Sequence, residues 1–322
     1  NYATGDDVSA ERRRLGEIAK RDHVYGAMVV EIQDNKIFHM RNVRANTRGH
    51  FVDLGVRYEG DNTKKSELEA LVLGDWHTGH TDKKSKEASF EMINEYKPKK
   101  IFLHDFFDGH SVSHWVDKKY FQEKIIQQVD KGFHHLDKEL KHCYDELQEI
   151  HSISPESSIY VVDSNHLRFL HRYLDEGRFM KDPANARVGL KLASYMVEKD
   201  RNNPVEAGIR MMGKLPKKVH FLDLDDDLKV RGYQLGSHGD KGPSGGRGSI
   251  KSKERDWGKS ITGHVHRGEM MRNTYTVGTN AELNPYYSRG RPSAMTHTNS
   301  LLWDSGTVQM VNIINGKYRN ES

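Results

Sequence analysis

Aspartate, histidine and asparagine residues gather in short polar stretches, each of which directly follows an apolar run. Two of these histidines, His264 and His266, stand one residue apart, and in an extended segment that spacing puts both side chains on one face. Carboxylate, imidazole and amide ligands without a thiolate suit manganese, iron or zinc. The pattern therefore indicates a metal site. The stretches are GDWH at 74–77, HDFFD at 104–108, DSNH at 163–166, GSH at 236–238 and GHVH at 263–266.

The number of candidate ligands exceeds the needs of a single ion. They fit two divalent ions about 3.5–4 Å apart that share one carboxylate, and such a pair holds both the entering and the leaving oxygen in phosphoryl displacement. The expected chemistry is therefore cleavage of a phosphate ester. The candidate metal ligands are Asp75, His77, Asp105, Asn165, His238, His264 and His266.

The elements that must position these ligands alternate between apolar strands and helices. Strands are predicted at 69–75, 99–105 and 157–165, with a helix at 84–97 and a further helical block at about 186–213. Short apolar runs flanked by helices are typical of a central sheet covered on both faces. In open α/β sheets the carboxyl ends of the strands face the ligand crevice. We therefore expect an α/β fold whose strand ends bring the polar stretches together.

The chain divides into two parts by its pattern. Residues 1–68 predict a small N-terminal accessory module, with a charged helix at 10–22 and a β-hairpin that turns at 34–35. Residues 69–322 predict the catalytic domain, interrupted by a helical insertion at about 116–150. Apolar residues recur at helical spacing in this insertion, which favours ordinary packing over a partner-binding face.

In this order, the polar stretches resemble the blocks of the calcineurin-like metallophosphoesterase superfamily, which read DxH, GDxxD, GNH, H and GHxH. The resemblance covers about residues 69–280. It implies a metallophosphoesterase-type sandwich of two mixed β-sheets flanked by helices. Within the superfamily, the chain looks closest to the nuclease branch, which includes DNA double-strand-break repair nucleases and phage-encoded relatives. A phage early protein that degrades or transfers DNA is the specific expectation.

The resemblance also implies roles for individual residues. Asp105 would bridge two metal ions, and His166 would be the catalytic acid that protonates or stabilises the leaving oxygen. Asp108 would support the site without binding metal directly. The ions are expected to be Mn²⁺, with iron or zinc as alternatives, and to provide the hydroxide that hydrolyses the phosphodiester. The first ion would be bound by Asp75, His77 and His266, and the second by Asn165, His238 and His264.

The chain departs from the family pattern in its second and third blocks. The second block begins with histidine where the family usually has glycine. Ser164 replaces the glycine of the third block, which would strain a turn that needed a positive φ. Leu167 follows His166 where the family usually has an acid. Whatever tunes His166 must then come from elsewhere, and Asp108 and His110 are the candidates.

The surroundings of the blocks favour DNA as the substrate. Protein phosphatases of the family typically carry one arginine after the second block and another before the third, and this chain has neither. Arg168, Arg172 and Arg247 are candidate phosphate contacts, the last of them in a basic, glycine-rich segment at 241–259. A solvated loop is the alternative interpretation of that segment.

Two alternatives to a Mn²⁺-dependent DNA nuclease remain open. One is a small-molecule phosphodiesterase or nucleotide phosphatase, and the other is a nonhydrolytic, metal-stabilised scaffold protein. A homo-oligomer or a complex with a protein partner would form through the helical insertion or the N-terminal module.

Composition indicates the cellular setting. The chain of 322 residues has a formal charge of +4 and one cysteine, Cys143, which excludes an internal disulfide framework and a zinc site built on several thiolates. No apolar run approaches the roughly 20 residues of a membrane span, and the first residues do not resemble a signal peptide. We therefore expect a cytoplasmic protein without membrane association, in the host cytoplasm if it is phage-encoded.

Overall fold

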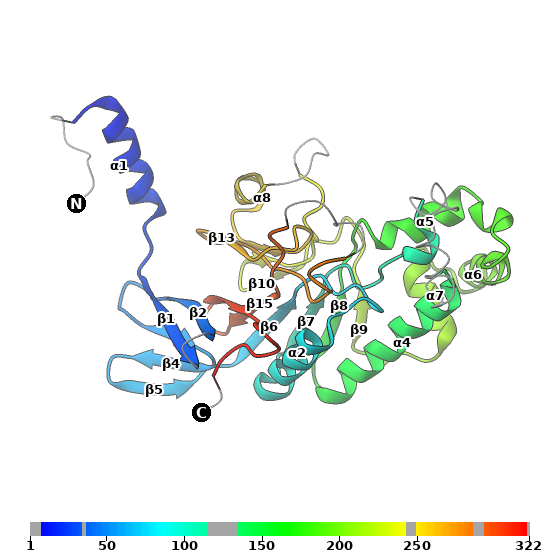
Figure 1. The fold of residues 1–322 in the computed structure, drawn as a ribbon, viewed down its shortest axis with the longest axis horizontal. Coiled ribbons are helices and arrows are strands. Elements are labelled where there is room, and N and C mark those ends of the chain that lie inside the picture. Colours follow the sequence, from blue (N-terminus) through cyan, green and yellow to red (C-terminus); the bar gives the residue numbers. More distant parts are fainter. Residues whose placement is uncertain (1–7, 34–36, 115–133, 243–248, 286–292, 321–322) are drawn as a thin grey trace.

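The computed structural model describes residues 8–33, 37–114, 134–242, 249–285 and 293–320. These residues form a mixed α/β structure with several sheets (Figure 1). A central sheet is covered on one face by helices and on the other by a second sheet, and each contact has its own hydrophobic core. The expected α/β class is confirmed at this level.

The central sheet has six strands within the described residues. They are β6 (Leu68–Leu73), β7 (Lys100–Leu103), β8 (Ser158–Val161), β9 (Val219–Phe221), β15 (Thr298–Trp303) and β16 (Val308–Asn312). Their order across the sheet is β16-β15-β6-β7-β8-β9. Strands β6 to β9 run parallel, while β15 and β16 form an antiparallel edge. β6 is buried along its whole length, as expected for a strand covered on both faces.

The second sheet packs on the central sheet through alternate side chains. Its strands are β10 (Lys229–Val230), β11 (Tyr233–Gln234), β12 (Ser260–Thr262), β13 (Glu269–Met271) and β14 (Thr274–Thr276). Ala70 and Val72 of β6 share a core with Ile261 of this sheet. Leu71 and Leu73 belong to the core on the helical side. This alternation follows from the two-residue period of a strand.

Helices cover the other face of the central sheet and extend beyond it (Figure 1). They are α2 (Lys83–Tyr96), η1 (His110–Val112), α4 (Leu136–Ile153), α5 (Leu167–Asp175), η3 (Arg178–Lys181), α6 (Ala186–Lys199) and α7 (Pro204–Met212), and α8 (Ile250–Trp257) lies beside the second sheet. The predicted helix at 84–97 is confirmed as α2. The predicted helical block is two helices, because Asn203 caps α7 and Pro204 occupies its first turn.

The N-terminal part contains the predicted helix and both predicted strands, together with a sheet that was not predicted. Its elements are α1 (Ala10–Asp22), β1 (Gly26–Gln33), β2 (Ile37–Arg44), β3 (Phe51–Asp53), β4 (Val56–Glu59) and β5 (Asn62–Lys65). The predicted turn at 34–35 lies outside the described residues. Strands β3 to β5 are short and β5 is exposed throughout, so each offers too short an apolar pattern to predict a strand.

Two expectations about surfaces are tested only in part. Residues 116–133 of the predicted insertion lie outside the described residues, whereas Leu140 and Leu147 on α4 are fully buried in the core, as the packing interpretation predicts. In the N-terminal hairpin, Met28 and Ile32 of β1 are exposed, and a partner there stays a prediction. Among the described helices, none has the length and apolar character to cross a bilayer.

Candidate metal centre

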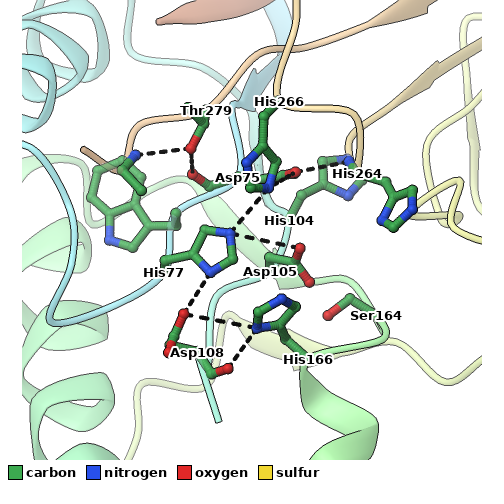
Figure 2. Close-up of polar contacts among 12 residues, drawn as sticks. Asp75, His77, His104, Asp105, Asp108, Ser164, His166, His264, His266 and Thr279 are labelled. Carbon is green, nitrogen blue, oxygen red and sulfur yellow. Dashed lines mark hydrogen bonds and ion pairs between the residues drawn. The ribbon is translucent and has the colours of Figure 1, made fainter. Parts of the chain in front are cut away.

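The polar stretches of the sequence meet where β6, β7 and β8 end (Figure 2). The segments after β6 and β7 run side by side, because the N–H of His77 donates to the carbonyl oxygen of Asp105 at 2.8 Å. The loops after β11 and β12 are joined in the same way, by the N–H of Gly263 and the carbonyl oxygen of His238 at 2.9 Å. These backbone bonds hold ligand-bearing segments from both sheets next to one another.

The first compact group combines the three residues predicted for the first ion with the predicted bridge. One ligand atom from each of its members lies within 4.8 Å of the others, and the members are Asp75, His77, Asp105 and His266. Nε2 of His266 lies 3.1 Å from Oδ2 of Asp75 and 3.2 Å from Nε2 of His77. Oδ2 of Asp105 lies 3.8 Å from Nε2 of His77. Imidazole and carboxylate lone pairs that converge in this way fit one divalent cation.

The residues predicted for the second ion also adjoin Asp105. Nε2 of His238 lies 3.2 Å from Oδ2 of Asp105. The ring of His238 packs edge-on against that of His264 with centroids 5.3 Å apart, and Nδ1 of His264 lies 3.1 Å from Oδ1 of Asn165. The structure thus brings all seven predicted ligands together. Asp105 contacts members of both sets, which is the position expected of a bridging carboxylate.

Buried carboxylate oxygens provide a test of whether these residues fit cations. Asp75 and Asp105 are fully buried; Oδ1 of Asp105 has no hydrogen-bond partner among the described residues, and its Oδ2 and the oxygens of Asp75 face imidazole nitrogens at 3.1–3.9 Å. A buried ionised carboxylate is costly unless it is paired or coordinates a metal. The arrangement therefore fits divalent cations that would occupy the lone pairs of Asp75 and Asp105.

The electrostatics of the centre favour positive charge. Burial lowers the pKa of an imidazole, yet the Asp105 and Asp75 carboxylates raise the pKa of His238 to about 9. Asp75 likewise raises the pKa of His266 in spite of its burial. Burial and the neighbouring His238 instead lower the pKa of His264 to about 4. The negative charge of Asp75 and Asp105 that holds a proton on two of these buried imidazoles would also attract a metal cation.

Several predicted ligands adopt a strained backbone conformation. The φ angle is 48° at His77, 42° at Asp105, 79° at His264 and 55° at His266. Residues other than glycine rarely adopt such angles, which cost about 1–3 kcal/mol each and cluster at functional sites. Ser164 does not have a positive φ, so its replacement of the family's glycine causes no strain of this kind.

Asp108 connects His77 with His166 (Figure 2). Its Oδ1 lies 2.8 Å from Nδ1 of His77, and its carbonyl oxygen accepts a hydrogen bond from Nδ1 of His166 at 2.5 Å. Burial works to raise the pKa of Asp108, but the hydrogen bond from His77 and the other imidazoles hold that pKa well below its usual range. Asp108 thus supplies the contact to His166 that Leu167 cannot make.

Two buried basic residues beside the centre were not predicted as part of it. His104 stands where the family has glycine; it is fully buried, and burial together with His238 lowers its pKa to about 3. Lys253 of α8 is 1% exposed and donates from Nζ to Oγ1 of Thr262 at 2.9 Å. Burial lowers the pKa of Lys253 to about 8. Nothing in its basic sequence context distinguishes this lysine from its solvated neighbours.

The arginines predicted to contact substrate phosphate have protein partners where they are described. Arg168 forms ion pairs with Asp163 and Asp240, and thereby ties the loop of Asn165 to that of His238. Arg172 pairs at 2.6 Å with a glutamate one helical turn further along α5. The third predicted contact, Arg247, lies outside the described residues. Phosphate binding by these arginines stays a prediction.

Comparisons with known proteins place the chain near a phage protein. No family model matches it. It is similar to protein A1 of Escherichia phage T5, with 28% identity over an alignment of 336 positions that covers 98% of this chain and 59% of the relative. The chain therefore spans about three fifths of the length of that relative. A solved structure overlaps 76% of this chain and 98% of its own, at a TM-score of 0.32 and 10% identity.

Proposed function

We propose that the chain is a dinuclear-metal phosphodiesterase of the calcineurin-like metallophosphoesterase type and that it acts as a Mn²⁺-dependent DNA nuclease. The two packed sheets then correspond to the sandwich of that superfamily, with residues 69–322 as the catalytic domain and 1–68 as an accessory module. One observation carries the proposal. The buried carboxylate of Asp105 has its Oδ2 3.8 Å from Nε2 of His77 and 3.2 Å from Nε2 of His238, so it adjoins imidazoles of both ligand sets.

The residues of the centre divide the work of the reaction. Two bound divalent cations would supply the positive charge that neutralises the phosphoryl oxygens and activates water. Nδ1 of His166 is occupied by the carbonyl oxygen of Asp108, so Nε2 is the nitrogen that exchanges a proton with the leaving oxygen. Asp108 is a positioning residue, since its contact with Nδ1 of His77 directs Nε2 of that ring toward His266.

Exposed cations on α8 support a nucleic-acid substrate. Lys251 and Arg255 are exposed and lie four residues apart on α8, on the face opposite to Lys253, which points inward to Oγ1 of Thr262. A phosphate chain bound beside the second sheet would meet this charged face of α8. The likeness to a phage protein supports a phage origin and, with it, action in the host cytoplasm.

Digestion of supercoiled and linear DNA tests the proposal. The chain is incubated with each DNA in Mn²⁺, in Mg²⁺ or with a chelator, alongside Asp105→Asn. We expect cleavage that requires metal and is fastest with Mn²⁺, and a loss of about 10³-fold in Asp105→Asn because shared coordination contributes several kcal/mol. Asp145→Asn, which changes an exposed aspartate on α4, is the matched control and should cleave normally.

Each alternative function predicts a different result in the same assays. Full activity of Asp105→Asn would contradict the bridging role. Hydrolysis of a chromogenic diester or a cyclic nucleotide without any DNA cleavage would identify a small-molecule phosphodiesterase. If the metal-loaded chain hydrolyses neither class of substrate, the scaffold alternative replaces the enzyme.

A further inference from the structure

A second cluster of metal-ligating side chains includes Asp108 but not His77. His80, Asp108 and His110 each offer one ligand atom, and these atoms all lie within 4.8 Å of one another. Nε2 of His80 is 3.9 Å from Oδ2 of Asp108, and the rings of His80 and His110 have centroids 6.0 Å apart. Neither His80 nor His110 is among the predicted ligands of the paired centre.

The two oxygens of Asp108 point to different groups. Oδ1 contacts Nδ1 of His77 at 2.8 Å, whereas the contact with His80 involves Oδ2. One carboxylate can therefore orient a ligand of the paired centre and still offer its second oxygen to another cation.

Both segments that carry the cluster are pinned by hydrogen bonds. The carbonyl oxygen of His80 accepts from the N–H of Glu282 at 3.1 Å, which ties its loop to the segment after β14. The turn before His110 is held by the buried carboxylate of Glu139, which accepts from the N–H of Gly109 at 2.6 Å and from Ser111. Ligands on segments held in this way need only small side-chain rotations to meet a common ion.

We propose that His80, Asp108 and His110 bind a third divalent cation, distinct from the paired centre. Two imidazoles and one carboxylate favour Zn²⁺ and Co²⁺ over the harder Mg²⁺. Three protein ligands leave one tetrahedral position for water or for a phosphate oxygen. The His80 and Asp108 side chains are 27% and 12% exposed, which gives an ion access from solvent.

Metal stoichiometry tests this site separately from the proposed nuclease centre. The full chain is stripped with a chelator and titrated with Co²⁺, and bound metal and the visible Co²⁺ spectrum are recorded for four proteins and a control. These are the wild type, His80→Ala, Asp105→Asn and the double variant. His142→Ala, on the exposed side of α4, is the matched control.

The expected results distinguish the two sites. His80→Ala should lose one equivalent of Co²⁺ and the tetrahedral bands of that ion, whereas His142→Ala should lose neither. Asp105→Asn should keep the ion that His80 binds, and the double variant should lose it. Wild-type stoichiometry and spectrum in His80→Ala would overturn the third site. Undiminished metal binding in Asp105→Asn would instead contradict the paired centre and leave the third site standing.

Discussion

At the scale of single residues, the centre depends on contacts that set the orientation of each imidazole. A metal-binding or proton-transferring histidine needs a partner on its second nitrogen, which fixes both the tautomer and the ring orientation. Asp108 provides this partner twice, through its carboxylate for His77 and through its backbone carbonyl for His166. Because one of these contacts uses the main chain, replacing the Asp108 side chain would disturb His77 more than His166.

The proposed acid role of His166 can be tested separately from metal binding. We expect His166→Ala to lower the rate of DNA cleavage by about 10² to 10⁴-fold, the usual contribution of general acid catalysis, with Mn²⁺ content unchanged. A diester with a nitrophenolate leaving group needs no proton on departure, so its hydrolysis should fall far less. Rates on both substrates, measured with the same protein, provide the comparison. An equal loss on both would rule out the acid role.

Gly263 is the residue at which added volume should affect metal binding most directly. A Cβ at this position would lie 2.2 Å from Oδ1 of Asp75 and 3.0 Å from Cβ of His104. Gly263→Ala should therefore displace Asp75, weaken Mn²⁺ binding and cost about 1–3 kcal/mol of stability through overpacking. Calorimetric titration with Mn²⁺ and urea unfolding measure the two effects.

Gly232→Ala is the control for this change, because its added Cβ meets nothing within 4 Å. Its φ of +81° should cost about 1 kcal/mol of stability with no change in Mn²⁺ affinity. Unchanged Mn²⁺ affinity in Gly263→Ala would show that Asp75 is not held where the structure has it.

At the scale of elements, α4 supports the loop that carries Asp108 through one buried acid. Glu139 accepts hydrogen bonds from Gly109 and Ser111 at the start of η1. Burial and the nearby Asp108 raise the pKa of Glu139 to about 7 from its ordinary value of 4.5. The folded protein therefore binds a proton there that the unfolded chain releases at lower pH.

This shift predicts a pH dependence of stability. Because the folded pKa is raised, the contribution of Glu139 is greatest below about pH 4.5 and declines as the pH rises to about 7, by up to about 3 kcal/mol. Glu139→Gln should flatten this decline, since glutamine stays neutral. Urea unfolding between pH 5 and 8 in the presence of chelator measures it, with the exposed Glu87→Gln as the control. Equal slopes for wild type and Glu139→Gln would contradict the shift.

At the scale of the whole molecule, the centre joins segments that are far apart in the chain. Its ligands come from loops after strands of both sheets, so a bound ion holds the two sheets together at one edge. An ion that binds only the folded state adds stability in proportion to the logarithm of its concentration. Asp75 and Asp105 repel each other, and the imidazoles of His238 and His266 offset this repulsion, since they lower the pKa of Asp75 in spite of its burial.

Mn²⁺ should therefore stabilise the entire fold. At a concentration one hundred times its Kd, we expect each independently bound ion to add about 2.7 kcal/mol to the free energy of unfolding. Asp105→Asn should gain much less from the same Mn²⁺. Thermal unfolding with increasing Mn²⁺ compares the two proteins. If the melting temperature of the wild type does not rise with Mn²⁺ concentration, that result would contradict a metal centre in this fold.

The sequence by itself determined the kind of chemistry and the order of the elements around it. The residue types alone identify the candidate metal ligands. Apolar runs followed by polar turns are local patterns, so the ends of β6, β7 and β8 could be predicted from neighbouring residues alone. The departure at Leu167 was visible as well, although two residues could have compensated for it.

Only the tertiary structure decided which side chains meet. That Arg168 binds Asp240 and that Lys253 points inward depend on contacts between loops distant in the chain, and no local period encodes such contacts. The short strands β3 to β5 escaped prediction for a related reason, since they are defined by pairing with one another more than by an apolar run. The second cluster, around His80, also exists only because folding brings two turns to the same carboxylate.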